Sequence, residues 1–476
     1  MIRFTKLVLV VLVAATAFQG QTSPPPPSQP RSVEFPKPVE QILPNGLRVI
    51  VVERHNTPLV TVSLVIKNGG EVDPPALMTA NLLTKGTTTR TATKIAYEVE
   101  SLGGMLDSVA QWDATSVSVE VMSDKLTPAT AILADVIRRP TFTLVEIERL
   151  RQQYLDTVTL ALDEPSSIAR FVGAKVLFGD ALYGHPILGT PESLKRIKQA
   201  DIVRMHRQYY RPDNAILVIG GDISIVDGFN VAKRFFGDWI KPKTRMPALP
   251  AAYRPDPQKK NRVVVIDKPD AGQAAVYLLR QGIDRQDADY YRGIVSNSVL
   301  SGYSGRLNQE IRIKRGLSYG AGSSLEARRG VGPYVASAQT KNESAVEVAG
   351  LLLGEVERLS SAPPSEVELT PRKAVLIGEF SRNLEAVNGL VSRISSLALY
   401  GVSLDEINRY IANVQSVTPE DIRRFSSSKL DAKSSDIIIV GNSKAFLTEL
   451  QKRFANVEVI PSADLDLNTK ELRKKK

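Results

Sequence analysis

Short stretches of alternating hydrophobic and polar residues, separated by stretches with helical spacing, fill most of residues 40–240. A period of two predicts strands, and apolar residues three or four positions apart predict helices that bury one face. The predicted strands are two within 41–53 around an Asn45-Gly46 turn, then 59–67, 105–110, 114–122 and 214–221. The predicted helices are one within 73–87, then 94–102, 126–138, 144–162, a helix-rich stretch over 166–210, and one ending near 236.

The same succession returns after residue 261. Its predicted strands are 262–267, 273–281, 318–326, 334–340 and 435–441, and its predicted helices are 287–301, 307–314, 344–359 and 364–385. The closing strand of the second half, Asp436-Ile-Ile-Ile-Val-Gly-Asn442, is similar to Asn214-Ala-Ile-Leu-Val-Ile-Gly220 in the first. A repeated order of elements predicts an α+β chain built from two homologous domains.

Stretches that lack this pattern set the expected boundaries. Residues 1–17 combine a basic start, a short apolar core and an Ala-Thr-Ala site, which is typical of a secretory signal peptide. We therefore expect an exported protein, most simply a periplasmic one, with no later membrane-spanning segment. The expected division is a signal peptide at 1–17, a Pro-rich spacer at 18–39, a first domain at 40–240, a linker at 241–260, a second domain at 261–460 and a basic tail at 461–476.

Composition excludes several kinds of chemistry. The chain has no cysteine, which removes disulfides, thiolate nucleophiles and Cys-ligated metals. Its formal charge of +10 is spread along the chain without aromatic residues between the basic ones, so nucleic acid is not an expected partner. The only basic run, 473–476, is either a solvated tail or a docking signal, and its composition favours the first.

The short helix expected within 73–87 has distinct ends. Asp73 is suited to cap its N-terminus, and Gly86 is suited to close its C-terminus in a left-handed conformation. Leu77, Ala80 and Leu83 fall on one face, a spacing that buries a helix against a sheet.

Several motifs, in the same order, resemble those of the insulinase/pitrilysin metallopeptidases, the group with an inverted His-x-x-Glu-His zinc motif. They are Lys85-Gly-Thr87 after the short helix, Leu43-Pro-Asn-Gly-Leu47, Leu102-Gly-Gly104 with Trp112-Asp-Ala-Thr115, Tyr209-Tyr-Arg-Pro-Asp-Asn214, Val218-Ile-Gly-Gly-Asp222, and Ser304–Arg312 with Arg315–Gly320. The resemblance covers most of residues 40–455. It implies two mostly antiparallel sheets flanked by helices, which together form one half of a clamshell around a peptide chamber.

The resemblance also assigns the zinc motif to positions that lack its ligands. Aligned on Lys85-Gly-Thr87, the motif positions hold Leu77, Ala80 and Asn81, and the position of the third ligand falls at Asp156 or Thr157. Zinc hydrolysis needs about three protein ligands and a general base, so we expect no metal here and no cofactor on this chain. The three histidines, His55, His185 and His206, are each expected to be packing or surface residues.

The second-domain motif is better preserved. The resemblance implies that Arg312 and Tyr319 reach the substrate carbonyl beside the zinc of a partner subunit, where an arginine and a phenol stabilise a developing oxyanion. The alternative is a surface charge and a strand aromatic. The strand at 105–110 matches the edge strand that holds substrate in active members, and it is equally open to a structural role.

Three hypotheses about function follow. The first is a non-catalytic subunit of a heteromeric zinc peptidase, like the degenerate partner in short-chain bacterial and mitochondrial members. Its partners would be a zinc-bearing homologue and unfolded peptide. The second is a non-enzymatic scaffold or peptide-binding protein. The third, an active metallopeptidase with other ligands, has the least support from the residues at positions 77, 80 and 81.

Overall fold

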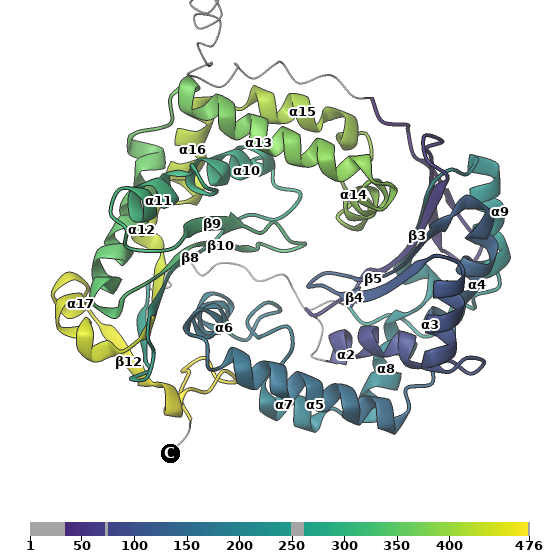
Figure 1. Ribbon diagram of the computed structural model, residues 1–476, viewed down its shortest axis with the longest axis horizontal. Coiled ribbons are helices and arrows are strands. Elements are labelled where there is room, and N and C mark those ends of the chain that lie inside the picture. Colours follow the sequence, from purple (N-terminus) through teal and green to yellow (C-terminus); the bar gives the residue numbers. More distant parts are fainter. Residues whose placement is uncertain (1–33, 72–74, 249–260, 475–476) are drawn as a thin grey trace, which may run out of the picture. The chain divides into compact units, whose positions relative to one another are not determined.

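The structure is a computed structural model that describes residues 34–71, 75–248 and 261–474. The described part of the unit from Phe35 onward contains two six-stranded sheets (Figure 1). The first sheet has the order β1-β2-β6-β3-β5-β4. Its strands are β1 (Val39–Ile42), β2 (Arg48–Glu53), β3 (Leu59–Ile66), β4 (Met105–Ala110), β5 (Thr115–Met122) and β6 (Ala215–Gly221).

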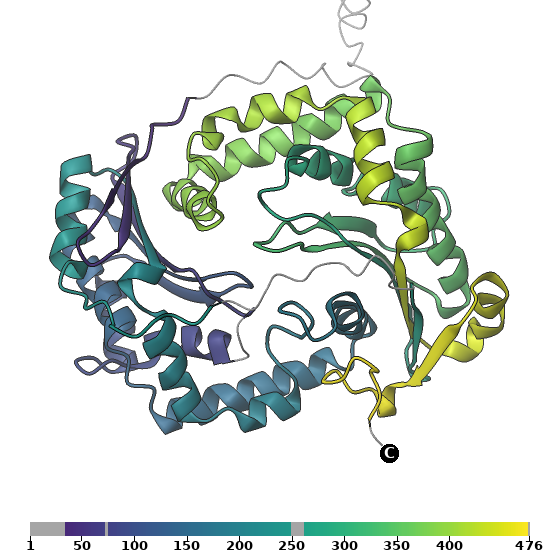
Figure 2. The same ribbon diagram turned by 180° about the vertical axis from the view of Figure 1, so that it is seen from behind.

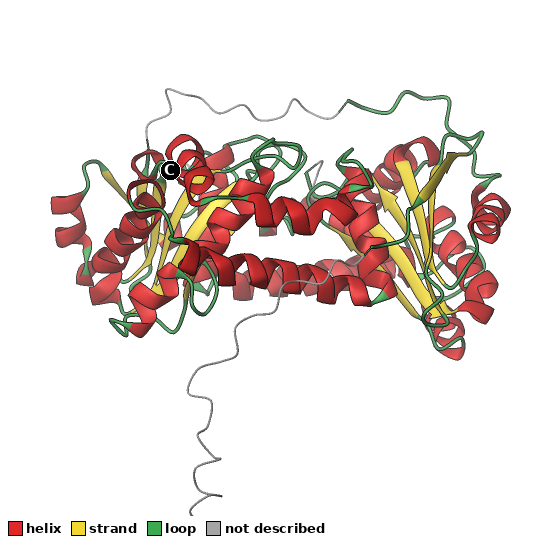
Figure 3. Ribbon diagram, turned by 90° about the horizontal axis from the view of Figure 1, so that it is seen from above, coloured by secondary structure: helices red, strands yellow, loops and turns green. Residues whose placement is uncertain are grey.

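The second sheet repeats this order as β12-β7-β11-β8-β10-β9. Its strands are β7 (Val263–Asp267), β8 (Ala274–Gln281), β9 (Ala321–Leu325), β10 (Pro333–Thr340), β11 (Asp436–Gly441) and β12 (Val457–Pro461). The strands gather in two separate groups in Figure 3.

The strand pairings show how far the two sheets correspond. β2 and β6 are parallel, and their counterparts β7 and β11 are parallel too. The other inner pairs are antiparallel in both sheets. The outermost strands differ, because β1 precedes β2 in an antiparallel hairpin whereas β12 comes from the far end of the chain and runs parallel to β7. The predicted fold class, α+β with two duplicated and mostly antiparallel sheets, is thus confirmed.

Helices of the first half cover one face of the first sheet. They are α2 (Pro75–Leu82), α3 (Ala92–Ser101), α4 (Leu126–Arg138), α5 (Leu144–Ala161), α7 (Pro191–Arg196), α8 (Gln199–Tyr209) and α9 (Ile225–Phe236). Alternate residues of β2, Val49 and Val51, join this core, while Ile50 and Val52 point to the opposite face and are equally buried. The first sheet is therefore covered on both faces, which explains the continuous apolar runs in its central strands.

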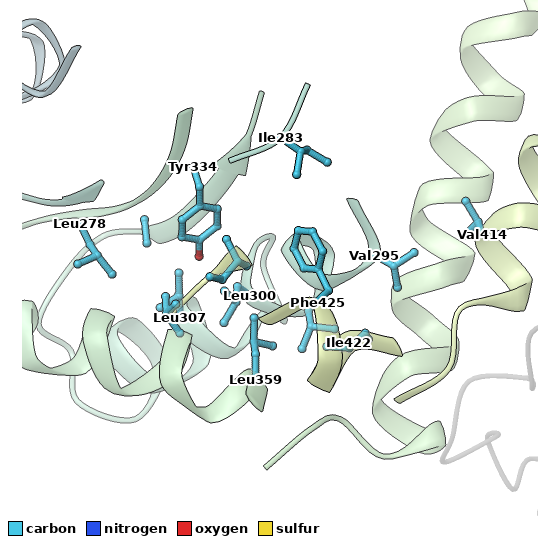
Figure 4. Close-up of a cluster of buried hydrophobic side chains, with 14 of the residues drawn as sticks. Leu278, Ile283, Val295, Leu300, Leu307, Tyr334, Leu359, Val414, Ile422 and Phe425 are labelled. Carbon is cyan, nitrogen blue, oxygen red and sulfur yellow. The ribbon is translucent and has the colours of Figure 1, made fainter. Parts of the chain in front are cut away.

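Helices of the second half form the larger core. They are α10 (Tyr290–Leu300), α11 (Arg306–Asn308), α12 (Ala345–Ser361), α13 (Glu366–Glu385), α15 (Glu406–Ser416), α16 (Pro419–Lys429) and α17 (Leu447–Arg453). Figure 4 shows a part of this core in which Tyr334 of β10 lies among Leu300, Leu307 and Phe425. Close packing of aliphatic and aromatic side chains supplies most of the stability of such a core.

Two helices cross between the halves. α6 (Pro165–Phe178), from the first half, packs on β8 and β11, and α14 (Val387–Leu399), from the second half, packs on β3 and β6 (Figures 1 and 2). Glycines allow the close approach: a Cβ at Gly173 would stand 2.6 Å from Leu279, and one at Gly220 would stand 2.6 Å from Val391. The residues of α6 fall in the expected first domain and no element was expected at 387–399, so this exchange was not predicted.

The structure corrects both ends of the expected fold. Phe35 lies inside the expected spacer, yet it is 8% exposed and its ring meets Phe380 edge-on at 6.2 Å. The segment expected as a basic tail, 461–476, is packed in part, because Leu467 and Leu472 are buried against α6 and β7, whereas Arg473 and Lys474 of the basic run are exposed. Apolar side chains in otherwise polar stretches account for both differences. The expected signal peptide lies outside the described residues.

The structure also bears on the expected linker and on membrane spans. Arg211, which is 3% exposed, donates to the carbonyl oxygens of Pro242 and Thr244, so the start of the expected linker is held to the first half. Residues 249–260 lie outside the described part. In the part of the chain that is described, no helix is long and apolar enough to cross a membrane.

Candidate functional site

The short helix expected within 73–87 is α2, which begins at Pro75 and ends at Leu82. The proposed cap Asp73 lies outside the described residues. A single 3-10 turn follows, and then Gly86 with φ 134° and ψ 145°. This backbone is extended with a positive φ, rather than in the expected left-handed helical conformation. Both conformations favour glycine, because a Cβ would clash with the backbone at positive φ.

The motif positions on α2 are engaged in packing. Ala80 is fully buried, and its carbonyl oxygen accepts a hydrogen bond of 2.7 Å from the Ser108 hydroxyl of β4. Of the expected apolar face, Ala80 and Leu83 are fully buried, whereas Leu77 is only half-buried. The most buried apolar side chains of α2 belong to Ala76, Met78, Ala80 and Leu82, because α8, α5 and β4 surround the helix.

Asn81 is paired with α5, but not with the residue that the alignment indicated. Its side-chain amide donates to the hydroxyl of Tyr154, which is 6% exposed and whose pKa burial raises to about 12. Asp156 is exposed and accepts instead from Gln152 at 2.8 Å on its own helix. The assignment of Asp156 to this site is therefore corrected: α5 turns Tyr154 toward α2, and residue 156 lies about 200° further around the helix.

The donors at these positions do not fit a zinc ion. Leu77 and Ala80 carry only alkyl groups, and the amide of Asn81 is hydrogen-bonded to the phenol of Tyr154. None of these side chains offers an imidazole or carboxylate ligand. Among the described residues no group of three or more His, Asp or Glu side chains is arranged to hold a metal. These positions of α2 are therefore engaged in packing and hydrogen bonding and offer no zinc-ligand chemistry.

Each of the three histidines is engaged with residues other than the motif positions of α2. His55 pairs with Asp222 at 2.8 Å beyond the end of β2. His185 packs against Trp112 with ring centroids 5.3 Å apart. His206 of α8 bonds the carbonyl oxygen of Ile137 at 2.7 Å, and burial lowers its pKa to about 4.

Of the second-domain pair, Tyr319 is exposed and Arg312 is half-buried. Tyr319 is 88% exposed, and the guanidinium carbon of Arg312 lies 5.5 Å from the ring centre of Tyr303, itself 71% exposed. Among the described residues, the aromatic ring over which the Arg312 guanidinium lies is that of Tyr303 and not that of Tyr319. Arg312 belongs to a π-helical turn, Gln309–Ile313, a geometry that is frequent at functional sites.

A buried polar network that the sequence did not reveal joins the two halves. Asp113, 2% exposed, accepts hydrogen bonds from the hydroxyls of Tyr183 at 2.6 Å and Tyr400 at 3.0 Å, and from the backbone N–H of Arg329 at 2.8 Å. The guanidinium of Arg329 also contacts Glu71 at 3.0 Å. Asp113 was noted only as part of a motif, because its partners come from distant parts of the sequence.

Glu71 is the most perturbed acid of this network. Its carboxyl is 3% exposed, and burial raises its pKa to about 7, although Arg329 acts in the opposite direction. The nearby charge of Asp113 raises it further. The loop before α2 therefore carries an acid that titrates near neutral pH.

The edge strand β4 borders α2. It pairs with β5 on one side, and Met105 and Val109 are 67% and 45% exposed. An edge strand with exposed apolar side chains is a template for the addition of an extended peptide.

Comparisons with known proteins identify the family. The model of the insulinase family, peptidase family M16, matches residues 48–184, and the model of the peptidase M16 inactive domain matches residues 196–376. Together these models span more than half of the chain, and both belong to one family. The protein is a member of peptidase family M16, as the sequence motifs predicted.

Particular relatives support this placement. The chain is 25% identical over 406 residues to an uncharacterised zinc protease of Streptomyces coelicolor, covering 83% of this chain and 88% of that protein. It is 24% identical over 357 residues to an uncharacterised zinc protease of Bacillus subtilis, covering 73% and 85%. The crystal structure of a peptidase M16 inactive domain from Pseudomonas fluorescens has a TM-score of 0.79 at 25% identity, covering 85% of this chain and 98% of that one. A protease structure from Helicobacter pylori, at 20% identity and a TM-score of 0.80, shares the fold.

Proposed function

We propose that this chain is the non-catalytic subunit of a heteromeric M16 peptidase, exported from the cytoplasm and paired with a zinc-bearing homologue. The observation that carries the proposal is the donor set on α2. Leu77 and Ala80 offer no ligand atom, and Asn81 is hydrogen-bonded to Tyr154. A hydrolytic zinc site cannot be assembled from such groups.

In this assignment the second half supplies substrate contacts. The exposure of Tyr319 supports a role across an interface, because this side chain contributes nothing to the core, and Arg312 is half-buried beside the exposed ring of Tyr303. A guanidinium and a phenol directed at a partner's reacting carbonyl stabilise its developing negative charge. The zinc belongs to the partner subunit.

A pull-down from the native host, followed by zinc analysis of each chain, tests the pairing. We expect a homologous partner with stoichiometric zinc, and peptidase activity that only the pair shows. Arg312→Ala and Tyr319→Phe should each reduce the activity of the pair about tenfold or more while leaving the stability of this chain unchanged. Arg315→Ala, three residues from Arg312 in sequence and ion-paired with Glu310, is the matched control. Full activity of both site variants would refute the donated contacts.

The second candidate is a peptide-binding scaffold that acts without a peptidase partner. The exposed apolar side chains of the edge strand β4 favour it. A purified chain that binds unfolded peptide, combined with a pull-down that yields no zinc-bearing homologue, would establish this alternative over the first.

A further inference from the structure

A cavity of about 380 Å³ lies beside the inner strands of the first sheet, and residues of both halves line it. The first half contributes Lys67 and Asn68, which follow β3, and Asn214, which precedes β6. The second half contributes Arg329, between β9 and β10, and Leu399, the last residue of α14. The volume is within the range of small-molecule sites, about 300–1,000 Å³.

The wall of this cavity combines apolar and basic side chains. Its apolar residues are Met246, Pro247, Ala248 and Leu399. Its basic residues are Lys67, Arg245 and Arg329. Among the described residues that line it, none carries a carboxylate. The cavity is therefore suited to a ligand with an apolar part and a negative charge.

The ammonium group of Lys67 has no ion-pair partner among the described residues. Burial lowers the pKa of Lys67, and the guanidinium groups of Arg48 and Arg329 lower it further. The carboxylate of Asp213 acts in the opposite direction, but Arg211 already binds it at 2.6 Å. A partly desolvated cation without a partner is stabilised by an added anion.

The other two basic side chains differ in their availability. Arg329 is paired with Glu71 at 3.0 Å and donates to the carbonyl oxygen of Lys67 at 2.8 Å, so it fixes this part of the wall. Arg245 is exposed and forms no ion pair with a described residue. Lys67 and Arg245 thus supply two positive charges that the described part of the chain does not neutralise.

Asn68 supplies a neutral donor beside these charges. It is 2% exposed, and its side-chain oxygen accepts a hydrogen bond of 2.8 Å from Asn214. Its amide nitrogen has no acceptor among the described residues, and this atom is not sealed from solvent. Because buried polar groups are normally hydrogen-bonded, this donor is suited to an oxygen atom of a ligand.

The position of the cavity in the sheet indicates a compact ligand. β3 pairs with β5 and β6, and β6 pairs with β2 and β3, so neither strand beside the cavity has a free edge. An extended peptide backbone therefore has no strand to pair with here. A bare inorganic anion fits poorly as well, because it would lose hydration against the apolar side of the wall.

We propose that this cavity binds a small organic acid with an apolar body. Its carboxylate pairs with Lys67 and Arg245 and accepts a hydrogen bond from Asn68. Its apolar body packs on Met246 and Leu399. Hydrogen bonds between a cation and a carboxylate are about twice as strong as neutral ones, so charge should dominate the affinity.

Isothermal titration calorimetry of the purified full chain with octanoate tests the proposal. Octanamide and octylammonium share its apolar part, and inorganic phosphate lacks it. The Kd for octanoate should be at least about tenfold lower than for each of these three compounds. Equal binding of octanamide or octylammonium overturns the role of charge, and equal binding of phosphate overturns the role of the apolar wall.

A capped dipeptide acid, N-acetyl-alanyl-leucine, distinguishes a free acid from the end of a peptide. Octanoate should bind more tightly than this compound, because the amide groups of the dipeptide would be desolvated against the apolar wall. The reverse order overturns the assignment to a free acid.

A pair of lysine variants locates the site. Lys67→Gln should weaken octanoate about tenfold without lowering the thermal midpoint, because it removes a cation that burial disfavours. Lys373→Gln is the matched control, since Lys373 of α13 is also half-buried without an ion pair among the described residues but lies outside the lining. Equal affinities of the two variants for octanoate overturn the assignment to the cavity.

Charge reversal at Arg245 provides a second variant that leaves the core intact, because this side chain is exposed. Arg245→Glu should weaken octanoate and strengthen octylammonium, and unchanged affinities for both overturn the proposal. Lys243→Glu is its control: Lys243 is exposed and outside the lining, so neither affinity should change by more than about twofold. All these measurements use the chain alone, so their outcome is separate from that of the zinc-bearing partner.

Discussion

Replacing Glu71 by Gln should raise the free energy of unfolding above that of the unmodified chain, and this gain should be larger at pH 8 than at pH 5. Glu71 accepts hydrogen bonds from the backbone N–H of Gly69 at 2.8 Å and from Arg329 at 3.0 Å, yet burial raises its pKa from 4.5 to about 7. Between these two values the folded chain binds a proton that the unfolded chain has lost. Stability contributed by this group therefore falls as pH rises from about 4.5 to 7.

The magnitude follows from the two pKa values. With 1.36 kcal/mol for each pKa unit, ionisation of Glu71 lowers the free energy of unfolding by about 0.8 kcal/mol at pH 5 and about 3.3 kcal/mol at pH 8. Gln has no proton to lose and retains an oxygen that accepts from Arg329. The difference in unfolding free energy between variant and wild type should thus grow by about 2.5 kcal/mol between pH 5 and pH 8.

Urea unfolding at pH 5, 6, 7 and 8 measures this difference, with the thermal midpoint as a second readout. Glu458→Gln is a control of opposite sign, because hydrogen bonding from Arg262 lowers the pKa of Glu458. The stability contributed by the ionised Glu458 carboxylate is lost only below about pH 4.5. The difference in unfolding free energy between Glu458→Gln and wild type should therefore stay constant from pH 5 to pH 8. A difference for Glu71→Gln that is also constant over this range would refute the reasoning.

Three further predictions concern folding and export. Gly173→Ala should destabilise the protein by about 1–3 kcal/mol, because the added Cβ meets Leu279 at 2.6 Å. The added Cβ of Gly354→Ala in α12 meets nothing within 4 Å, so this variant should be more stable than wild type by about 0.5 kcal/mol. Urea unfolding measures the sign of each change. Asp113→Ala should lower the free energy of unfolding by about 3 kcal/mol, since it leaves one buried and two partly buried donors without their acceptor, and an effect below about 1 kcal/mol would contradict the network. N-terminal sequencing of the protein secreted by its host should begin at residue 18, and an intact Met1 would refute export through cleavage.

Local sequence information was enough to predict most strands and long helices. The alternation over 115–122 becomes β5, whose residues are buried and half-buried in turn over nearly the whole strand. The α2 positions were also readable, because a motif within one helix depends only on short spacing. Leu77, Ala80 and Asn81 lie within or almost within one turn of each other, so the missing ligands needed no tertiary information.

Positions on other elements could not be predicted in this way. Whether Tyr154 or Asp156 faces Asn81 depends on the rotation of α5 about its axis, which the packing of that helix decides. The same holds for Asp113, whose partners Tyr183 and Tyr400 are 70 and 287 residues away in sequence. No local pattern records contacts of this range.

By itself the sequence determined that the chain is duplicated and where most of its strands lie. Only the tertiary structure decided that the central strands are buried on both faces and which helices cover those faces: α6 of the first half lies on the second sheet, and α14 of the second half lies on the first. The physical reason is that the free energy gained by burying apolar surface is non-directional and does not depend on how far apart the partners lie in the sequence. An apolar strand indicates only that some element must cover it. Which helix does so depends on complementary shape, such as the close approach that Gly173 and Gly220 allow.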